Sequence, residues 1–132
     1  MKPLLIFLLL AINLPAQTTD WVKSFGGAAS DKGISIGTDS LGFIYISGYY
    51  NNEATFGGIT LTNQNLSTNG NNKENFIAKL DSTGDVIWAI PGGNQEYGCC
   101  DDRALGMHVT PGGDVFITGT FWSSYYLGVR GA

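Results

Sequence analysis

The chain has few charged side chains, one histidine and two cysteines, and these shortages restrict the chemistry it can perform. Of its 132 residues only 14% are charged, with eleven acidic and seven basic side chains. Phosphate-binding surfaces need a cluster of Lys and Arg, so we expect no nucleic-acid partner. The single histidine, His108, has no Ser or Cys in an elbow motif beside it, so a Ser-His-Asp site is not indicated.

Long apolar runs are missing after the first residues. The segment "MKPLLIFLLLAINLPAQ" begins with Lys2, continues with an apolar run over residues 4–14, and reaches Ala16 before Gln17. This run is much shorter than the roughly twenty residues that span a bilayer, and the pattern is typical of a secretory signal peptide. We therefore predict a signal peptide over residues 1–16, a secreted or outer-surface location, and no transmembrane segment after its removal.

Glycine is abundant, and the sequence repeats itself. The chain has 19 glycines, roughly twice the average share. The stretch "DSLGFIYISG", residues 39–48, returns 71 residues later as "TPGGDVFITG", residues 110–119, and Trp21 is matched by Trp88. A unit of this length has room for four strands and their turns, so we predict a repeat architecture.

Alternating apolar and polar residues predict the strands of one unit. These are residues 33–38, 43–50, 75–80 and 85–90, with a further strand at 21–25 and an extra short hairpin within 51–73. The tetrapeptides "DSLG", "DSTG" and "TPGG" predict tight turns, because Asp bonds the backbone two residues on, Gly supplies positive φ and Pro presets the turn. The turn residues are Asp39, Gly42, Asp81, Gly84 and Gly113.

Four antiparallel strands per repeat predict an all-β fold made of β-propeller blades. We expect residues 17–132 to form the repeat region. Within it, 17–30 would supply the outer strand of a closing blade, 31–93 one complete blade, and 94–132 a truncated second blade. Because propellers need four to eight blades, this is an incomplete propeller, and we expect an N-terminal fragment whose partners are the missing C-terminal blades. Self-assembly of short chains into a ring is the alternative.

The order of these motifs resembles a known family. Trp, Gly-Gly, Asp, "DSLG", "IYISG", "ATFGG" and "FIAKLDSTGDVIWA" are similar to the SBBP-type β-propeller repeats of secreted bacterial proteins. The resemblance covers residues 21–128 and implies a surface-exposed protein of the kind associated with type IX secretion. "DSL" and "DST" also resemble an O-glycosylation acceptor pattern of such bacteria, which makes Ser40 and Ser82 candidate glycosylation sites.

Two further groups of residues are candidate sites. Cys99 and Cys100 are adjacent in an exported chain and are candidates for a vicinal disulfide, for pairing elsewhere, or for an unremarkable loop dithiol. Their spacing from His108 fits no familiar zinc pattern, so we predict no metal site. Aromatic residues near predicted strand ends and loops form a candidate ligand surface: Tyr49, Tyr50, Tyr97, Trp122, Tyr125 and Tyr126.

These observations favour a binding or scaffold module over an enzyme. We expect recognition of a protein or glycan at the cell surface by loops around a rigid ring, with no catalytic residue and no cofactor. One alternative is a propeller enzyme, such as a quinoprotein-like dehydrogenase or a polysaccharide-cleaving protein, whose catalytic residues lie beyond Ala132. Another is a structural surface repeat or adhesin. Fold alone does not decide among them.

The signal-peptide interpretation predicts a defined mature N-terminus. Mass spectrometry of the exported chain should find a start within about two residues of Gln17, because signal peptidase cuts after a small residue such as Ala16. Extracellular protein that retains Met1 would contradict this expectation.

Overall fold

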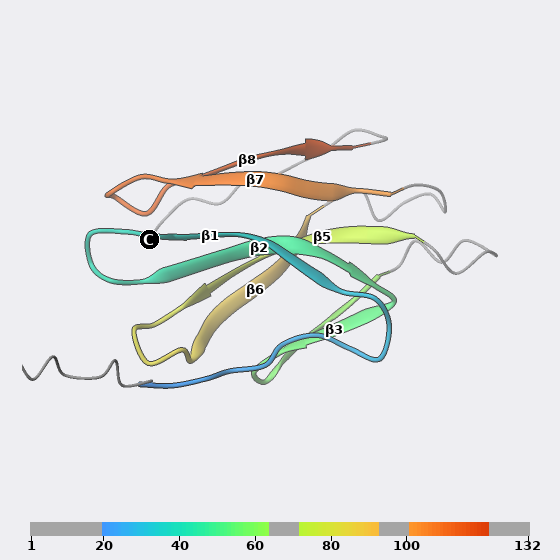
Figure 1. The fold of residues 1–132 in the computed structure, drawn as a ribbon, viewed down its shortest axis with the longest axis horizontal. Helices are drawn as coiled ribbons and strands as arrows, with labels where there is room; N and C mark the ends of the chain where they lie inside the picture. Colours follow the sequence, from blue (N-terminus) through green and yellow to red (C-terminus); the bar gives the residue numbers. More distant parts are fainter. Residues whose placement is uncertain (1–19, 64–71, 93–100, 122–132) are drawn as a thin grey trace, which may run out of the picture.

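The structure is a computed structural model that describes residues 20–63, 72–92 and 101–121, and this part of the chain is built from antiparallel strands (Figure 1). The described strands are β1 (Lys32–Thr38), β2 (Ile44–Asn51), β3 (Glu53–Phe56), β4 (Ile59–Thr62), β5 (Lys73–Leu80), β6 (Val86–Gly92), β7 (Arg103–Val109) and β8 (Val115–Thr120). These described ranges contain no helix, and therefore none that could cross a membrane. The all-β prediction is confirmed.

Four strands form the main sheet, in the order β1-β2-β5-β6. They correspond to the four predicted strands, with ends shifted by up to two residues. The β3–β4 hairpin lies between β2 and β5 in the sequence and forms a separate two-stranded sheet. It is the extra short hairpin predicted within residues 51–73. β7 and β8 form a third, two-stranded sheet.

Each of the three tetrapeptides forms the turn between two paired strands. Asp39 Oδ1 accepts hydrogen bonds from the backbone N–H of Leu41 and Phe43, and Asp81 Oδ1 does the same for Thr83 and Asp85. The fourth residue is a glycine with φ between 81° and 89° at all three turns. This left-handed conformation carries a steric cost for any residue with a Cβ, which is why glycine occupies the position.

The segment 21–25 is not a strand, so the prediction of an outer strand there is wrong. Its side chains, rather than its backbone, hold it to the sheet. The indole Nε1 of Trp21 donates to the carbonyl oxygen of Ser82 (3.0 Å), and Lys23 pairs with Asp85 (2.8 Å). Trp21 therefore covers the turn between β5 and β6 instead of extending the sheet, and the backbone bridge that follows, Gly26 to Thr55, leads to β3.

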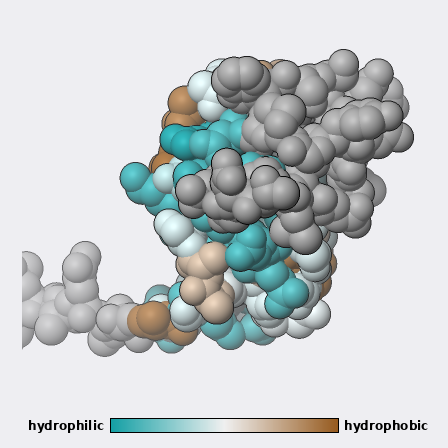
Figure 2. Space-filling model, turned by 90° about the vertical axis from the view of Figure 1, so that its right-hand side faces the viewer, coloured by the Kyte–Doolittle hydropathy of each residue, from teal (hydrophilic) through white to brown (hydrophobic). Residues whose placement is uncertain are grey.

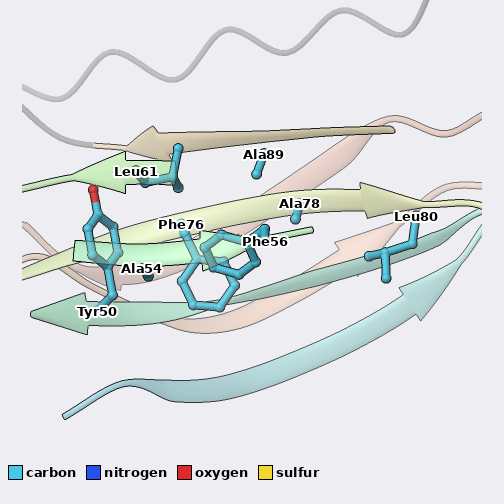
Figure 3. Packing of buried hydrophobic residues seen from close by; sticks show 8 residues of the cluster. All are labelled: Tyr50, Ala54, Phe56, Leu61, Phe76, Ala78, Leu80 and Ala89. Atoms are coloured by element: carbon cyan, nitrogen blue, oxygen red, sulfur yellow. The ribbon is translucent and has the colours of Figure 1, made fainter. Parts of the chain in front are cut away.

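One side of the main sheet packs against the β3–β4 hairpin, and we call it the hairpin side. The register places Ile46 opposite Ala78 and Ile44 opposite Leu80, so their side chains share this side. Figure 3 shows the resulting core, in which Phe56 of the hairpin lies against Phe76 of β5 (ring centroids 4.6 Å apart). Burial of aromatic and aliphatic side chains of this kind contributes roughly 1.5–3 kcal/mol each.

The other side of the main sheet, which we call the far side, is covered by β7, and β8 lies beyond β7 (Figure 1). Tyr45 lies on it and is only 2% exposed. A Cβ placed on Gly37 would lie 2.8 Å from Val109, so the absent side chain makes room for β7. At the turns, Ser40 donates from both its backbone N–H and its hydroxyl to the carbonyl oxygen of Pro111.

The repeat in the sequence is also a repeat in structure. The β1–β2 pair has a bulge between Gly33 and Ser35, and the β7–β8 pair has one at Ala104 to Gly106, again 71 residues later. Gly48 faces the carbonyl oxygen of Lys32, and its counterpart Gly119 faces that of Arg103. Two successive units thus share turn, bulge and close approach, and they pack against each other.

The close approach at Gly48 predicts a position-specific loss of stability. In Gly48→Ala the new Cβ would overlap with the Lys32 carbonyl oxygen, and the strands would have to move apart, at a cost of about 1–3 kcal/mol or more. Gly119→Ala should behave in the same way. Gly33→Ala is the matched control, because nothing lies within 4 Å of its Cβ. Thermal unfolding of the three variants measures the difference, and equal midpoints would contradict the register.

Candidate functional site

At one edge of the structure lie the C-terminal ends of β2, β6 and β8 and the N-terminal ends of β5 and β7, and the tight turns lie at the opposite edge (Figure 1). Figure 2 views the first of these edges, where the described surface is largely hydrophilic. Loops that carry function usually project from such a rigid framework, so this edge is the candidate site. We call it the polar edge and define it by Tyr49, Tyr50, Lys73, Glu74, Asp101, Asp102 and Arg103.

The ends of β2, β5 and β7 place these residues. The β2–β5 register sets Tyr50 opposite Glu74 and Asn51 opposite Lys73. The start of β7 lies next to these strand ends: the backbone N–H of Asp102, just before β7, donates to the carbonyl oxygen of Lys73 (2.9 Å). The polar edge is therefore a junction between the main sheet and the β7–β8 sheet.

Tyr49 has a cation from each sheet near its ring. Lys73 Nζ of β5 lies 5.8 Å from the ring centroid, and the guanidinium carbon of Arg103 of β7 lies 5.5 Å from it. Such contacts contribute about 0.5–1 kcal/mol when partly exposed. Tyr49 thereby joins the two sheets, and its ring is already in contact with protein groups.

Asp101 connects the same two cations. Its carboxylate accepts a hydrogen bond from the Lys73 backbone N–H (3.1 Å) and from the Arg103 guanidinium, and it lies 3.9 Å from Lys73 Nζ. Burial alone would raise the pKa of Asp101, but the hydrogen bond from Arg103 and the bond from the Lys73 backbone outweigh it and lower the pKa. Asp101 is therefore charged at neutral pH and acts as an acceptor within the junction.

Glu74 is the unusual group of the polar edge, because its side chain is 2% exposed. Burial, and next the charge of Asp102, raise the pKa of Glu74 to about 7. Burial and the nearby Glu74 also raise the pKa of Tyr50 above its ordinary value. Glu74 Oε1 and Tyr50 Oη have no hydrogen-bond partner among the described residues. The carboxyl of Glu74 thus keeps its proton to a higher pH than an exposed glutamate does.

Two hollows lie beside Asp31, and the smaller of them reaches the hairpin side of the main sheet. The larger has about 470 Å³ and is lined by Ser24, Phe25, Gly26, Gly27, Ala29, Asp31, Thr55 and Gly57. Asp31 accepts hydrogen bonds from the backbone N–H groups of Gly27 (2.6 Å) and Asn51 (3.2 Å). Because both carboxylate oxygens are engaged, Asp31 fixes the backbone around the hollow.

The charged groups Lys73, Asp101 and Arg103 of the polar edge are bonded to one another. The hydroxyl and carboxyl groups of this edge include no nucleophile paired with a base in the described residues, and no cluster of three or more His, Cys, Asp or Glu there could hold a metal ion. Glu74, whose pKa is raised to about 7, faces the hairpin side rather than the contact with β7.

The structure places some of the candidate residues that were predicted from the sequence. Tyr49 is half-buried in the junction and Tyr50 is fully buried, so Tyr50 does not contribute to an exposed surface. Ser40 and Ser82 are exposed, although the Ser40 hydroxyl donates to Pro111. The remaining candidates lie outside the described residues: Tyr97, Cys99, Cys100, Trp122, Tyr125 and Tyr126.

Sequence reasoning missed Glu74, although a signal was present. In "KENFIAKL" the residues two, four and six positions after Glu74 are Phe76, Ala78 and Leu80. Alternation in a strand places all four on one side, and that side is the apolar hairpin side. A carboxylate in phase with core residues is the pattern that could have identified it.

Comparison with known proteins gives one match. The family model "SBBP: Beta-propeller repeat" matches residues 20–52, about a quarter of the chain. This segment contains β1, β2 and the turn between them, together with the segment anchored by Trp21. No curated protein and no solved structure matches the chain. The match supports a β-propeller repeat and says nothing of export or of a ligand.

The raised pKa of Glu74 predicts a stability that falls with rising pH. The folded state holds the proton up to pH about 7, whereas the unfolded state releases it near its ordinary value of 4.5, so stability is lost between these values. Glu74→Gln should remove this loss and raise the melting temperature at pH 8 relative to wild type by on the order of 5 °C.

Thermal unfolding at pH 5 and pH 8 measures the effect. At pH 5 the variant and the wild type should melt within a degree or two of each other, roughly. Glu53→Gln is the control, because Glu53 is exposed on β3 and should leave the pH dependence unchanged. Parallel pH curves for wild type and Glu74→Gln would contradict the assignment.

Proposed function

We propose that the chain is an exported repeat module of the β-propeller type, and that it scaffolds or binds a partner at the cell surface. Residues 64–71 and 93–100 would contact that partner, a protein or a glycan. The main sheet would serve as one blade and β7–β8 as the first strands of the next.

One observation carries the proposal: two successive units have the same bulge, turn and glycine contact, and the second covers the far side of the first. Propeller blades are sheets repeated around an axis with each face packed on a neighbour. The adjacent turns, joined by the two bonds from Ser40 to Pro111, are consistent with such an axis. The family match at residues 20–52 supports the same interpretation.

Two further features favour recognition over reaction. The charged groups of the polar edge, Lys73, Asp101 and Arg103, are used within the junction between the sheets. Residues 64–71 and 93–100 precede the polar-edge residues Lys73 and Asp101 in the sequence, and connecting segments are where binding residues concentrate. Residues 1–16 have the pattern of a signal peptide, which supports export.

The proposal is tested with the purified, labelled chain and two probes: intact cells of the source organism and their isolated surface polysaccharide. We expect saturable, reversible binding to the cells and no new reducing ends in the polysaccharide. Replacing residues 64–71 and 93–100 by Gly-Ser segments of equal length should reduce binding at least about tenfold without changing the unfolding midpoint.

Leu41→Ser is the matched control, because Leu41 is exposed at the turn on the opposite edge and should leave binding unchanged. Release of reducing ends would support a polysaccharide-cleaving enzyme instead. Absence of binding, or binding that survives both replacements, would overturn the recognition role of the polar edge.

A further inference from the structure

The contact between the two units shows which side of one unit packs against which side of the next. β7–β8 faces the far side of the main sheet with the side that carries Met107 and Val109. Their counterparts in the first unit, 71 residues earlier, are Ile36 and Thr38 on the hairpin side, and the registers agree: Ile36 is opposite Ile46, and Met107 is opposite Ile117. The hairpin side of one unit therefore fits the far side of the unit before it.

Each of these two surfaces, the hairpin side and the far side of a unit, occurs a second time in the chain, where no described strand covers it. Ile36, the counterpart of Met107, is 72% exposed on the hairpin side of the first unit. Phe116, the counterpart of the buried Tyr45, is 61% exposed on the far side of the second unit. Ile36 is apolar like Met107, and Phe116 is aromatic like Tyr45.

The turn glycines give the same result. A Cβ placed on Gly113 would lie 2.9 Å from Tyr45 Oη, because the first unit covers that turn. A Cβ placed on the equivalent Gly42 would meet nothing within 4 Å. The first unit thus leaves open the position that Tyr45 occupies in the internal contact, and Phe116 is the residue equivalent to Tyr45.

We infer that this chain associates head to tail with a second copy of itself, in which the Phe116 surface of one copy covers the Ile36 surface of the next. The two surfaces are different, so the contact is heterologous and leaves one surface of each kind free in a dimer. A hollow of about 190 Å³ next to Ile46, lined also by Phe56 and Phe76, lies on the receiving side.

The contact between copies differs from the internal contact in three ways. His108 stands where Gly37 leaves room for Val109, so the contact between copies has to accommodate its side chain. Pro111 stands where Ser40 stands in the first unit and has neither an N–H nor a hydroxyl, so the two hydrogen bonds between turns are lost. Phe116 replaces Tyr45 and removes a hydroxyl that would need a partner. The association therefore depends on apolar contact, and it should be reversible and dependent on concentration.

The test uses Ile36→Lys and Phe116→Lys, each of which places a charge in one of the two surfaces. Both residues are exposed, so both variants should keep the unfolding midpoint of the wild type. Sedimentation velocity over a range of concentrations should show association of the wild type and none of either variant alone. Ile87→Lys is the matched control, because Ile87 is exposed on β6, at the other end of the strand order, and should associate like the wild type.

Mixing the variants gives the decisive result. Ile36→Lys retains the Phe116 surface and Phe116→Lys retains the Ile36 surface, so an equimolar mixture should form a one-to-one dimer that grows no further. A wild type that stays monomeric overturns the inference. So does a symmetric association, which would appear as self-association of one of the two variants or as no dimer in the mixture.

Discussion

The central strands of the main sheet, β2 and β5, carry apolar or aromatic side chains on both sides, so each side has to be covered by another layer. Ile46 and Phe76 point to the hairpin side, while Tyr45 and Ile77 point to the far side. An antiparallel sheet with one wet side would alternate apolar and polar residues, and these strands do not. The β3–β4 hairpin covers one side, and β7 covers the other. The arrangement of the rest of the described chain follows from this requirement.

The polar edge is a consequence of the same layering. Where β2 and β5 end, the side chains between the layers become polar, and the register still directs Glu74 toward the hairpin side with Phe76. Removing a carboxylate from water disfavours its charged form, so Glu74 holds its proton to about pH 7. On the far side the same strand ends bring Tyr49 to Arg103 of β7, and cations and Asp101 join the two sheets. Along β5, the buried Glu74 of the hairpin side therefore directly follows Lys73, which pairs with Asp101 on the far side.

Local signals predicted the strands and turns, because those depend on alternation and on the special geometry of Asp and Gly. "DSLG" and "DSTG" need only their own four residues to form a turn, and they do so at Asp39 and Asp81. The segment 21–25 has apolar residues suited to a strand, but the Trp21 indole finds a carbonyl acceptor 61 positions away at Ser82, which no local pattern reveals. Tyr50 was equally beyond a local prediction, since its burial depends on Ala54 and Leu61 of a separate hairpin.

The differences between the two units are as informative as their similarities. Positions that hold each unit together are the same in both: the bulge, the glycine beside a carbonyl, and the glycine at the turn. Positions on the far side differ, with Gly37 and Tyr45 in the first unit replaced by His108 and Phe116 in the second. Gly37 leaves space for Val109, and the Tyr45 hydroxyl donates to Asp39 beside the turn that β7–β8 covers. The second unit lacks both of these features. Its far side is therefore suited to a different neighbour from the one that β7–β8 provides to the main sheet.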